Sequence, residues 1–350
     1  MRLLTAGESH GIGLIGVLEG LPAGAQIDID RINADLERRQ RGYGRGDRQK
    51  IESDTVTVMS GLNGGTTLAS PVAYFISNRD YANWTDVMSP EWGDISLKKL
   101  SRVRPGHADL AGIKKYGFGD NARPVLERAS ARETAARVAG GSMCRQVLEQ
   151  VGVTIEGEVL HVCGVEDVEA QHAAIDKARE DGDTLGGEVR VTVKGMPVGV
   201  GSYVEYDRRL DALYAFYLMG INAVKAVGIG MGSKLSYLKG SEAHDEIFAD
   251  GRHTNRAGGI DAGMSNGEDI VLTVSFKPIP TLMNGLRTVD VSTGEETTAA
   301  TERSDVCVVE AAVVVTESVV AIATLKALLD TFGGDTMEEL RRRMDERRKA

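Results

Sequence analysis

The feature that most constrains the fold is a pair of similar segments far apart in the chain. Residues 20–24 read Gly-Leu-Pro-Ala-Gly and residues 195–199 read Gly-Met-Pro-Val-Gly, and an Asp-Arg pair follows each. Each copy then continues into a helical pattern, a glycine-rich turn and a strand pattern. Since self-similarity indicates repeated structural units, we expect an α+β fold with two similar halves, residues 1–150 and 190–330. A chance match is the alternative.

The 350 residues fit one large domain or two modest ones. Nothing in the sequence justifies two independent domains, so we expect residues 1–350 to form one domain that ends in a charged helix at 331–350. Helical periodicity predicts helices at 31–40, 168–180 and 312–329, and alternation and apolar runs predict strands at 51–60, 71–76, 153–165, 188–198 and 270–276.

A glycine pattern near the N-terminus imitates a dinucleotide-binding motif. Residues 11–16 match G-x-G-x-x-G. In a Rossmann fold this motif must open a helix, whereas residues 17–24 have the pattern of a strand that leads into a turn. We therefore reject a dinucleotide-binding turn at this position.

The charge distribution favours a small anionic ligand. The net charge is −10, yet residues 31–50 hold seven Lys/Arg against three Asp/Glu, and residues 98–145 hold eleven against four. Two concentrated basic patches on an acidic protein suggest focused capture of a small polyanion. An RNA-binding protein is the alternative class. It is disfavoured by the pI of about 5.3 and the aromatic content of 5%.

Several observations favour a cytoplasmic protein. No uninterrupted run of eighteen apolar residues predicts a membrane span, and Glu8 comes too early for a signal peptide. Cys144, Cys163 and Cys307 are scattered, which suits a reducing compartment and argues against a zinc site. We therefore expect no metal, no membrane and no nucleic-acid partner.

Residues 104–109, Arg-Pro-Gly-His-Ala-Asp, place a titratable group on a turn. Proline and glycine do not fit comfortably inside a helix or a central strand, so we expect His107 to lie on a turn. A histidine there can exchange a proton near neutral pH. His10, which lies between two glycines after a short apolar strand, is a similar candidate. A structural histidine bonded within its turn is the alternative for both.

The next motif combines a helix start with arginines. Ser130 and Glu133 have the spacing of a capping box, and the N-terminus of such a helix attracts anions. Arg128 and Arg132 could hold a phosphate or carboxylate beside it. The alternative is a capped surface helix with solvated arginines.

Residues 38–48 form an arginine- and glycine-rich loop that could close over a ligand. A solvated basic loop is the alternative. Further glycines gather at 219–228 and 255–267, where they let the backbone approach a flat or anionic ligand. Residues 277–281 form a rigid turn with one cation.

Four motifs together resemble the chorismate synthase family. They are Gly-Glu-Ser-His-Gly at 7–11, residues 104–109, Arg-Ala-Ser-Ala-Arg-Glu at 128–133 and Arg-Ser-Asp-Val-Cys at 303–307. Their order, and the stretches at 222–223 and 277–281 between them, extend the resemblance over roughly residues 1–330.

The resemblance implies a carbon–oxygen lyase that catalyses the last step of the shikimate pathway. In an anti-1,4-elimination, 5-enolpyruvylshikimate 3-phosphate loses phosphate and a C6 hydrogen to give chorismate. Reduced FMN is required without net redox change, and NADPH is the candidate reductant. The implied fold is a βαβ sandwich, and the implied assembly is a homotetramer.

The resemblance also implies residue roles. His10 would protonate the departing phosphate, His107 would protonate reduced flavin, and Asp305 would assist flavin N5 in taking the C6 proton. Arg39 and Arg45 would bind NADPH or the substrate phosphate. The implied FMN site comprises Arg128, Ala129, Ser130, Asn222, Ala223, Ala262, Lys277, Pro278, Ile279, Pro280, Thr281 and Arg303.

The sequence leaves alternatives open for some of these residues, and two positions depart from the family pattern. Asp305 could instead cap the following helix, and Cys307 is expected to be a packing thiol. Ala69 and Ala262 stand where the family usually has glycine, and we expect a negative φ at Ala262. A flavin reductase, or a phosphate-ester lyase with another substrate, is the alternative enzyme.

Overall fold

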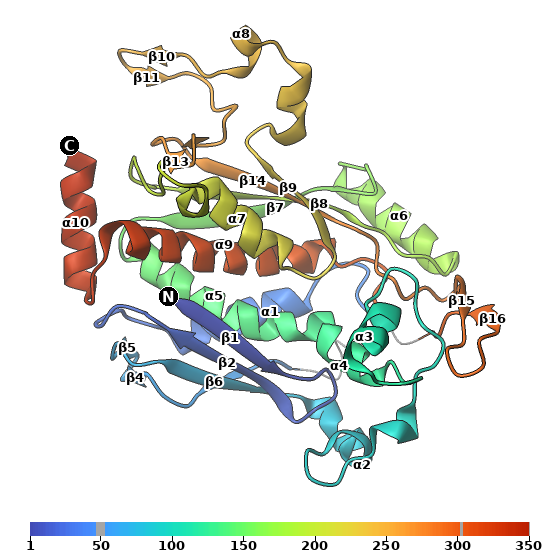
Figure 1. The fold of residues 1–350 in the computed structure, drawn as a ribbon. Helices are drawn as coiled ribbons and strands as arrows, with labels where there is room; N and C mark the ends of the chain where they lie inside the picture. The colour runs from blue at the N-terminus through green and yellow to red at the C-terminus, as the bar shows by residue number, and fades with distance from the viewer. Residues whose placement is uncertain (47–52, 302–303, 350) are drawn as a thin grey trace.

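The computed structural model describes residues 1–46, 53–301 and 304–349. Its N-terminal half contains a four-stranded antiparallel sheet (Figure 1). The order of the strands in this sheet is β1 (Arg2–Gly7), β2 (Gly13–Glu19), β6 (Val72–Ser77) and β3 (Val56–Val58). Gly13 and Gly16 lie under Phe75 and Tyr74, whose rings occupy the space that side chains at these glycines would need.

The C-terminal half contains a second four-stranded antiparallel sheet. Its order is β7 (Thr154–Val162), β8 (Gly187–Lys194), β14 (Ile270–Phe276) and β9 (Val224–Ile229). Every second residue of β8 and β14 is buried, which is the alternation expected of a sheet with one face on the core.

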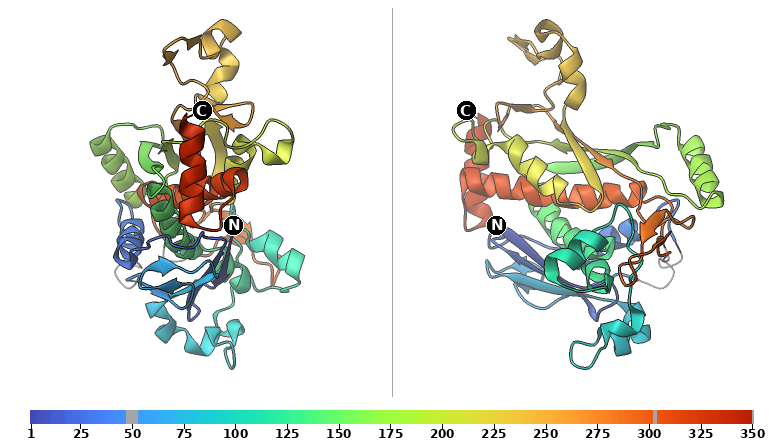
Figure 2. Two further views of the ribbon diagram at one scale, coloured as in Figure 1. Left: turned by 90° about the vertical axis from the view of Figure 1, so that its left-hand side faces the viewer. Right: turned by 45° about the vertical axis from the view of Figure 1, so that its right-hand side comes forward.

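A layer of helices lies between the two sheets (Figures 1 and 2). It contains α1 (Ile29–Gln40), α5 (Thr134–Glu149), α7 (Leu210–Met219) and α9 (Val309–Phe332). A Cβ at Gly141 of α5 would lie 2.4 Å from the carbonyl oxygen of Ser318 in α9, so glycine permits these two helices to approach closely. The sheet–helix–sheet arrangement confirms the predicted α+β sandwich.

Helix α9 is apolar on all sides because it is a core helix. Of the helices in the described ranges, it alone is long and apolar enough to cross a membrane, but 89% of its apolar window is buried inside the protein. The search of the sequence for an uninterrupted apolar run did not find this helix, although its length and mean hydropathy would suit a membrane span.

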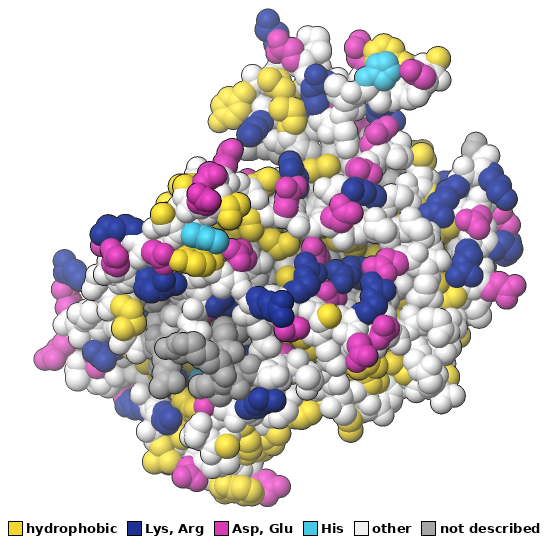
Figure 3. All heavy atoms as spheres, turned by 180° about the vertical axis from the view of Figure 1, so that it is seen from behind, with side chains coloured by type: hydrophobic (Ala, Val, Ile, Leu, Met, Phe, Trp, Pro, Cys, Tyr) yellow, Lys and Arg dark blue, Asp and Glu magenta, His cyan; other side chains and the backbone are white. Residues whose placement is uncertain are grey.

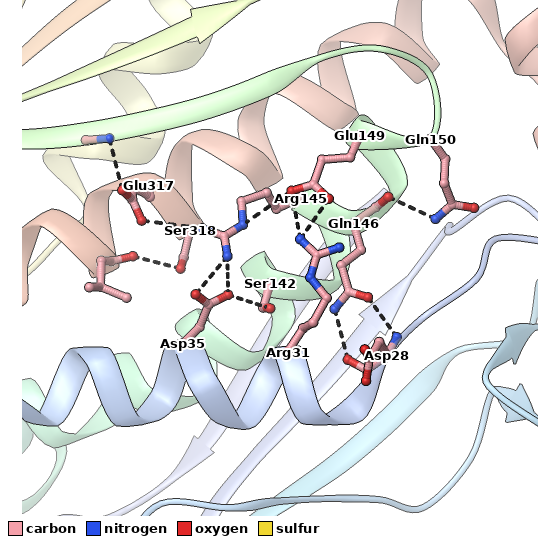
Figure 4. Close-up of polar contacts among 12 residues, drawn as sticks. Asp28, Arg31, Asp35, Ser142, Arg145, Gln146, Glu149, Gln150, Glu317 and Ser318 are labelled. Carbon is pink, nitrogen blue, oxygen red and sulfur yellow. Dashed lines mark hydrogen bonds and ion pairs between the residues drawn. The ribbon is translucent and has the colours of Figure 1, made fainter.

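Polar side chains connect three helices of the central layer (Figure 4). Asp35 of α1 accepts hydrogen bonds from Arg145 and Ser142 of α5, each at 2.7 Å. Glu317 of α9 accepts from Arg38 at 3.0 Å and lies 3.5 Å from Arg145. Since Asp35 and Glu317 are both buried, loss of one partner would leave an uncompensated charge inside the layer.

The remaining elements surround this sandwich. Residues 232–252 form an arm that projects from the second sheet (Figures 1 and 2). On the face shown in Figure 3, basic side chains are interspersed with acidic ones. The other elements are β4 (Leu62–Asn63), β5 (Thr66–Thr67), η2 (Arg79–Asn83), α2 (Thr85–Met88), η3 (Ile95–Lys98), α3 (Asp109–Tyr116), α4 (Arg123–Ala129), η4 (Ala131–Glu133), α6 (Val168–Glu180), η5 (Tyr206–Arg208), η6 (Gly232–Tyr237), α8 (Gly240–Ala243), β10 (Ile247–Phe248), β11 (Gly251–Arg252), β12 (Ile260–Asp261), β13 (Met264–Ser265), β15 (Arg287–Val289), β16 (Glu296–Thr298) and α10 (Met337–Lys349).

Most predicted elements agree with the structure. The bounds of α6 and β14 are as predicted, and β2 is a strand, which confirms the rejection of a Rossmann turn. The strand expected at 51–60 is shorter, since β3 spans Val56–Val58, and residues 51–52 lie outside the described ranges. The tail helix α10 buries Met337, Leu340 and Met344, so one face of it packs on the core.

The two sheets share one topology. In each, the first two strands of the half pair with each other, and the last strand lies between the second and the third. A helix follows the second strand in both halves, as α1 and α7. Two copies of one motif would produce this arrangement. The single domain and its internal repeat nevertheless stay predictions, which the shared strand order supports.

Candidate active site

A buried carboxylate holds the ring of His10. The turn after β1 presents His10 to Glu127 of α4, which accepts from the backbone N–H of His10 at 2.9 Å. Its two carboxylate oxygens lie 2.9 and 3.0 Å from Nδ1. Because an ionised carboxylate can only accept, Nδ1 carries the hydrogen. Nε2 is therefore the atom that can exchange a proton with a ligand.

An aromatic ring fixes the plane of the same imidazole. His10 stacks on Trp84, with ring centroids 3.9 Å apart and an interplanar angle of 19°. Lys98 Nζ lies 3.6 Å from the centroid of the Trp84 ring, and Asp80 Oδ2 lies 3.9 Å from His10 Nε2. Trp84 thus contacts a candidate catalytic side chain directly.

His107 lies on the predicted turn and has a carboxylate of its own. Gly106 has a φ of +78°, which a glycine adopts without strain. His107 Nδ1 lies 2.5 Å from Asp109 Oδ1 and 3.0 Å from Arg104 NH2. Because the closer partner is a carboxylate, which can only accept, the hydrogen lies on Nδ1 and Nε2 is left for exchange. Arg104 donates to Asp109 through Nε and NH2, at 2.9 and 3.0 Å.

The charges around Asp109 keep it ionised. Burial alone would raise the pKa of Asp109, but the hydrogen bonds from His107 and Arg104 and their charges lower it well below its usual range. Asp109 therefore stays an acceptor at any working pH, which fixes the tautomer of His107.

The two carboxylates sit on neighbouring helices. Asp109 begins α3, and Glu127 lies in α4. A small core beside the main one joins these helices to the segment before them; its buried members are Leu100, Val103, Ile113, Ala122, Leu126 and Ala300. Both candidate histidines are thus fixed to one packed unit.

Predicted flavin residues connect the histidines. At the end of α4, the carbonyl of Ala129 accepts from Asn222 Nδ2 at 3.1 Å. The carbonyl of Ala223 accepts from the backbone N–H of Lys277 at 3.0 Å, and Lys277 Nζ donates to the carbonyl of Gly106, beside His107. This run of contacts joins segments from both halves of the chain and links α4, which holds His10, to the turn of His107.

Further predicted flavin residues lie along the same run. Thr281 Oγ1 accepts from Arg104 NH1 at 3.1 Å, and Ser130 Oγ lies 3.2 Å from Ser9 Oγ. The carbonyl of Ile279 accepts from Thr184 at 2.7 Å. Gly106 would place a Cβ 3.4 Å from Pro280, so the turn that carries His107 packs on residues 277–281. Arg303 lies outside the described residues.

Arg128 and Arg132 contact protein groups. Arg128 donates to the carbonyls of Thr5 and Gly7 at 3.0 and 3.1 Å, and so ties α4 to β1. Ser130 caps the short helix η4 by accepting from the N–H of Arg132. Glu133 pairs with Arg137 at 3.0 Å, and no capping box is formed at η4 or at the start of α5, both of which are fully described.

Asp305, Arg39 and Arg45 form a charged cluster. Arg45 NH1 lies 3.2 Å from Asp305 Oδ2, and the N–H of Gly46 donates to Asp305 Oδ1 at 2.6 Å. Arg39 is buried and donates to Thr134 and to the carbonyl of Ala131, each at 3.0 Å. Burial lowers the pKa of Arg39 to about 10, and the charges of Arg132 and Arg45 add to this effect.

A second polar run joins this cluster to the turn of His10. Asp54 lies between Arg39 and Arg132, at 3.5 and 2.7 Å. Arg132 Nε donates to Asn78 at 3.0 Å. The amide nitrogen of Asn78 donates to the carbonyls of residues 8, 9 and 11. The run therefore links Arg39 to the turn of His10, and the charges of Arg45 and Asp305 act on Arg39.

The residues present fit a flavin mononucleotide. Asn222 Oδ1 is buried and has no hydrogen-bond partner among the described residues, as expected of an acceptor that a ligand N–H would satisfy. Arg45 Nε is likewise a buried donor without a described partner. Lys277 adds a cation, and desolvation lowers the pKa of this ammonium group. Together these groups can bind a polar ring system and a phosphate.

The expectation of a negative φ at Ala262 is wrong. Ala262 has a φ of +50° and Gly263 a φ of +85°. These two residues close the β12–β13 hairpin, in which Asp261 pairs with Met264. A two-residue hairpin turn of type I′ needs positive φ at both central positions. Ala69 and Ala223 also have positive φ, of 62° and 68°, so these alanines adopt the conformation that glycine favours.

Sequence analysis missed the residues that support the predicted ones. Asp109 could have been found, because it stands two residues after His107 in the quoted motif. Glu127, Asn78 and Asp54 contact partners that are distant in sequence, and their spacing in the chain gives no signal of these contacts.

Two surface hollows lie away from the predicted catalytic residues. One hollow of about 330 Å³ lies between α1, β7 and α9, and another of about 470 Å³ lies beside α1 and α5. Neither is lined by a predicted catalytic residue. Among the described residues, no group of three or more His, Cys, Asp or Glu is arranged to hold a metal ion.

Comparisons with known proteins identify relatives of this chain. The family model described as chorismate synthase matches residues 1–329. A chorismate synthase of Thermoanaerobacter pseudethanolicus is 49% identical, with 99% of this chain and 97% of that protein covered. One of Alkaliphilus metalliredigens is 48% identical, with 97% of each covered. A crystal structure of chorismate synthase superposes with a TM-score of 0.78 at 34% identity and covers 100% of this chain and 98% of that one. The chain belongs to the chorismate synthase family.

Proposed function

We propose that this chain catalyses the anti-1,4-elimination of phosphate from 5-enolpyruvylshikimate 3-phosphate, which gives chorismate. The observation that carries the proposal is the continuous run of contacts from His10 to His107 through predicted flavin residues. It supplies two imidazoles, each with Nδ1 held by a buried carboxylate and Nε2 available for proton exchange.

The leaving phosphate and the lost proton are far apart on the substrate, so one acid–base pair cannot drive the reaction in a single concerted step. When bound, reduced FMN supplies an electron-rich ring that favours loss of the phosphate. The protein then has to position the substrate, exclude water and stabilise charge.

We assign the proton donors by their position. His10 Nε2 would carry the proton for the departing phosphate, with Glu127 orienting the ring and Trp84 fixing its plane. His107 Nε2 would hold a proton beside the flavin, where Lys277 contacts the same turn. Positioned general acids of this kind contribute about 10²–10⁴ in rate.

Asp305 would act at the other end of the elimination. The bonds from Arg45 and Gly46 keep the Asp305 carboxylate in place, where it would assist removal of the C6 proton. Arg45 has a donor to offer, because its Nε has no partner among the described residues. The donors of Arg39 contact Thr134, Ala131 and Asp54, so we infer that Arg39 fixes these protein groups. That these arginines bind the substrate phosphate or NADPH stays a prediction.

We also propose a cytoplasmic homotetramer that uses NADPH as reductant. Exposed apolar side chains on the projecting arm, such as Ile247 and Tyr237, support an assembly, because subunit interfaces cover side chains of this kind. Sedimentation of the purified chain tests the tetramer, and flavin reduction by NADPH without an added reductase tests the reductant.

The experiment that tests the function is an anaerobic assay. The chain is mixed with reduced FMN and the enolpyruvyl substrate, and chorismate absorbance and phosphate release are followed together. We expect equal amounts of both products and no net oxidation of the flavin. Phosphate release without chorismate would indicate a phosphate-ester lyase of another kind, and flavin turnover without phosphate release would indicate a flavin reductase.

The Arg45→Ala variant tests the assignment of the anion site. We expect weaker substrate binding with little change in melting temperature, because Arg45 keeps a donor for the ligand. An unchanged Michaelis constant with a lower melting temperature would contradict the assignment.

A further inference from the structure

Residues 41–46 form the turn that carries Arg45, and this turn contacts α6, α9 and the segment before α9. We call this segment the Tyr43 turn. Its backbone runs beside the segment that carries Asp305. The carbonyl of Gly44 accepts from the N–H of Val306 at 2.8 Å, and Gly46 donates to Asp305. The ion pair of Arg45 and Asp305 thus lies between two hydrogen bonds of the backbone, one at Gly44 and one at Gly46.

Glu310, in the first turn of α9, anchors the start of the Tyr43 turn. Its Oε2 accepts from the backbone N–H of Tyr43 at 2.9 Å, and its Oε1 lies 3.4 Å from His172 Nε2. Gly42 has a φ of +125°, and a Cβ there would lie 3.2 Å from Glu310 Cβ. The backbone of the turn therefore follows the surface of Glu310 closely.

Helix α6 holds the turn from the other side through the side chain of Tyr43. The ring of Tyr43 stacks on His172, with centroids 4.0 Å apart and an interplanar angle of 15°. Its hydroxyl donates to Asp176 Oδ2 at 2.5 Å, and this hydrogen bond raises the pKa of the Tyr43 phenol. A Cβ at Gly44 would lie 3.0 Å from Ile175 of the same helix and from Cys307.

We propose that Tyr43 and Glu310 are positioning residues, which hold the turn between α6 and α9 so that the Arg45 guanidinium faces Asp305 and the ligand. This inference rests on the role proposed above for Arg45 and Asp305. Neither residue touches the reacting atoms in this account. They act by fixing the backbone at residue 43, two residues from Arg45, and displacements of about 1 Å in a catalytic group cost as much as 10²-fold in rate.

The first test replaces each anchor and its conservative counterpart. We expect Tyr43→Ala and Glu310→Ala to lower kcat/KM about 10- to 100-fold, mainly through a higher KM. Glu310→Gln should restore most of the activity, because the amide oxygen can still accept from the N–H of Tyr43. Tyr43→Phe should fall between wild type and Tyr43→Ala, since it keeps the stacked ring and loses the bond to Asp176.

The second test is a double-mutant cycle, which separates positioning from general stability. Tyr43→Ala is measured in the wild-type background and in the Arg45→Ala background, with melting temperatures for all four proteins. If Tyr43 acts through Arg45, its replacement should change kcat/KM less than about twofold once Arg45 is gone. Equal losses in both backgrounds would overturn the inference.

Helix α6 offers a matched control. Asp176 bonds to Tyr43, whereas Glu180 on the same helix lies 3.9 Å from Lys177. Asp176→Ala should raise KM, and Glu180→Ala should not. Equal effects of the two changes would overturn the inference. An Arg45→Ala enzyme with wild-type kinetics would overturn it together with the role of Arg45. Chorismate formation by the wild-type chain would still support the proposed reaction.

Discussion

The two candidate histidines are held in the same way but by partners at very different distances in sequence. His107 receives its carboxylate from Asp109, two residues away, and Arg104 of the same motif neutralises that carboxylate. His10 receives its carboxylate from Glu127, which is 117 residues away. The geometry at Nδ1 is alike, yet the first is built by one turn and the second by the packing of α4 against the turn after β1.

This difference indicates where each site is vulnerable. The His107 turn carries a buried cation and a buried anion within six residues, so loss of the anion leaves Arg104 buried without its partner. The carboxylate of Glu127 lies between His10 and the more distant Arg123, at 3.7 Å. We therefore expect removal of Asp109 to damage both stability and activity, and removal of Glu127 to damage mainly activity.

Asp109→Asn should have the largest effect. The amide cannot act as a fixed acceptor for both Arg104 and His107, so the tautomer of His107 is no longer determined. By analogy with the Asp→Asn change in a catalytic triad, kcat should fall about 10⁴-fold. Loss of the buried pair should cost about 3–5 kcal/mol in the free energy of unfolding. Kinetics and denaturant titration measure the two effects, and an Asp109→Asn enzyme with near-normal kcat would contradict the role of His107.

The dependence of the free energy of unfolding on acidic pH tests the same comparison. The pKa of Asp109 is lowered in the folded protein, so its ionised form stabilises the fold above the unfolded value of about 3.9. That contribution is lost as the pH falls from about 4 toward the folded pKa. The stability difference between wild type and Asp109→Asn should therefore be constant above about pH 5 and shrink below about pH 4. A difference that grows with acidity would contradict the sign.

Glu127→Gln should have the second largest effect. With the amide oxygen in the place of Oε2, glutamine can still accept from the His10 backbone N–H, but its NH2 group in the place of Oε1 faces Nδ1–H as a second donor. We expect kcat to fall about 10²- to 10³-fold, with a smaller loss of stability than Asp109→Asn causes. If the two variants lose equal stability, the distinction between the local and the distant carboxylate does not hold.

Trp84→Leu should have a moderate effect. Stacking of this kind is worth about 0.5–1.5 kcal/mol, so we expect kcat/KM to fall roughly threefold to tenfold. Trp92→Leu is the matched control, because Trp92 is 68% exposed and should give wild-type kinetics. Equal effects of the two changes would show that Trp84 does not act through His10.

Ala262→Gly should have the smallest effect. The left-handed conformation at this position strains an alanine, so glycine should raise the free energy of unfolding by about 1 kcal/mol or less and leave kcat unchanged. A destabilised variant would contradict the hairpin explanation.

Sequence patterns anticipated the features that depend on nearby residues. The bounds of α6 and β14, the turn at His107 and the strand character of β2 all follow from local periodicity, proline and glycine. The φ of Ala262 was missed, because the demand of hairpin closure outweighs the preference of one alanine. The order of the strands was not anticipated.

Contacts between distant segments could not be read from spacing. Asn78 binds the turn of His10 from the end of β6, and Glu310 binds Tyr43 from the start of α9. The motif resemblance supplied candidate residues in both halves, and the structure shows what supports them. The role of each candidate in the reaction stays a prediction that the variants above test.

The central claim is that His10 and His107 serve one reaction at one site. The most direct test is an anaerobic single-turnover experiment with reduced FMN and 5-enolpyruvylshikimate 3-phosphate, in which chorismate formation is followed for His10→Ala, His107→Ala and the double variant. Because groups that act as a unit are strongly non-additive, the double variant should lose little more rate than the more damaged single variant. Full multiplication of the two losses, or wild-type turnover in either single variant, would contradict the claim.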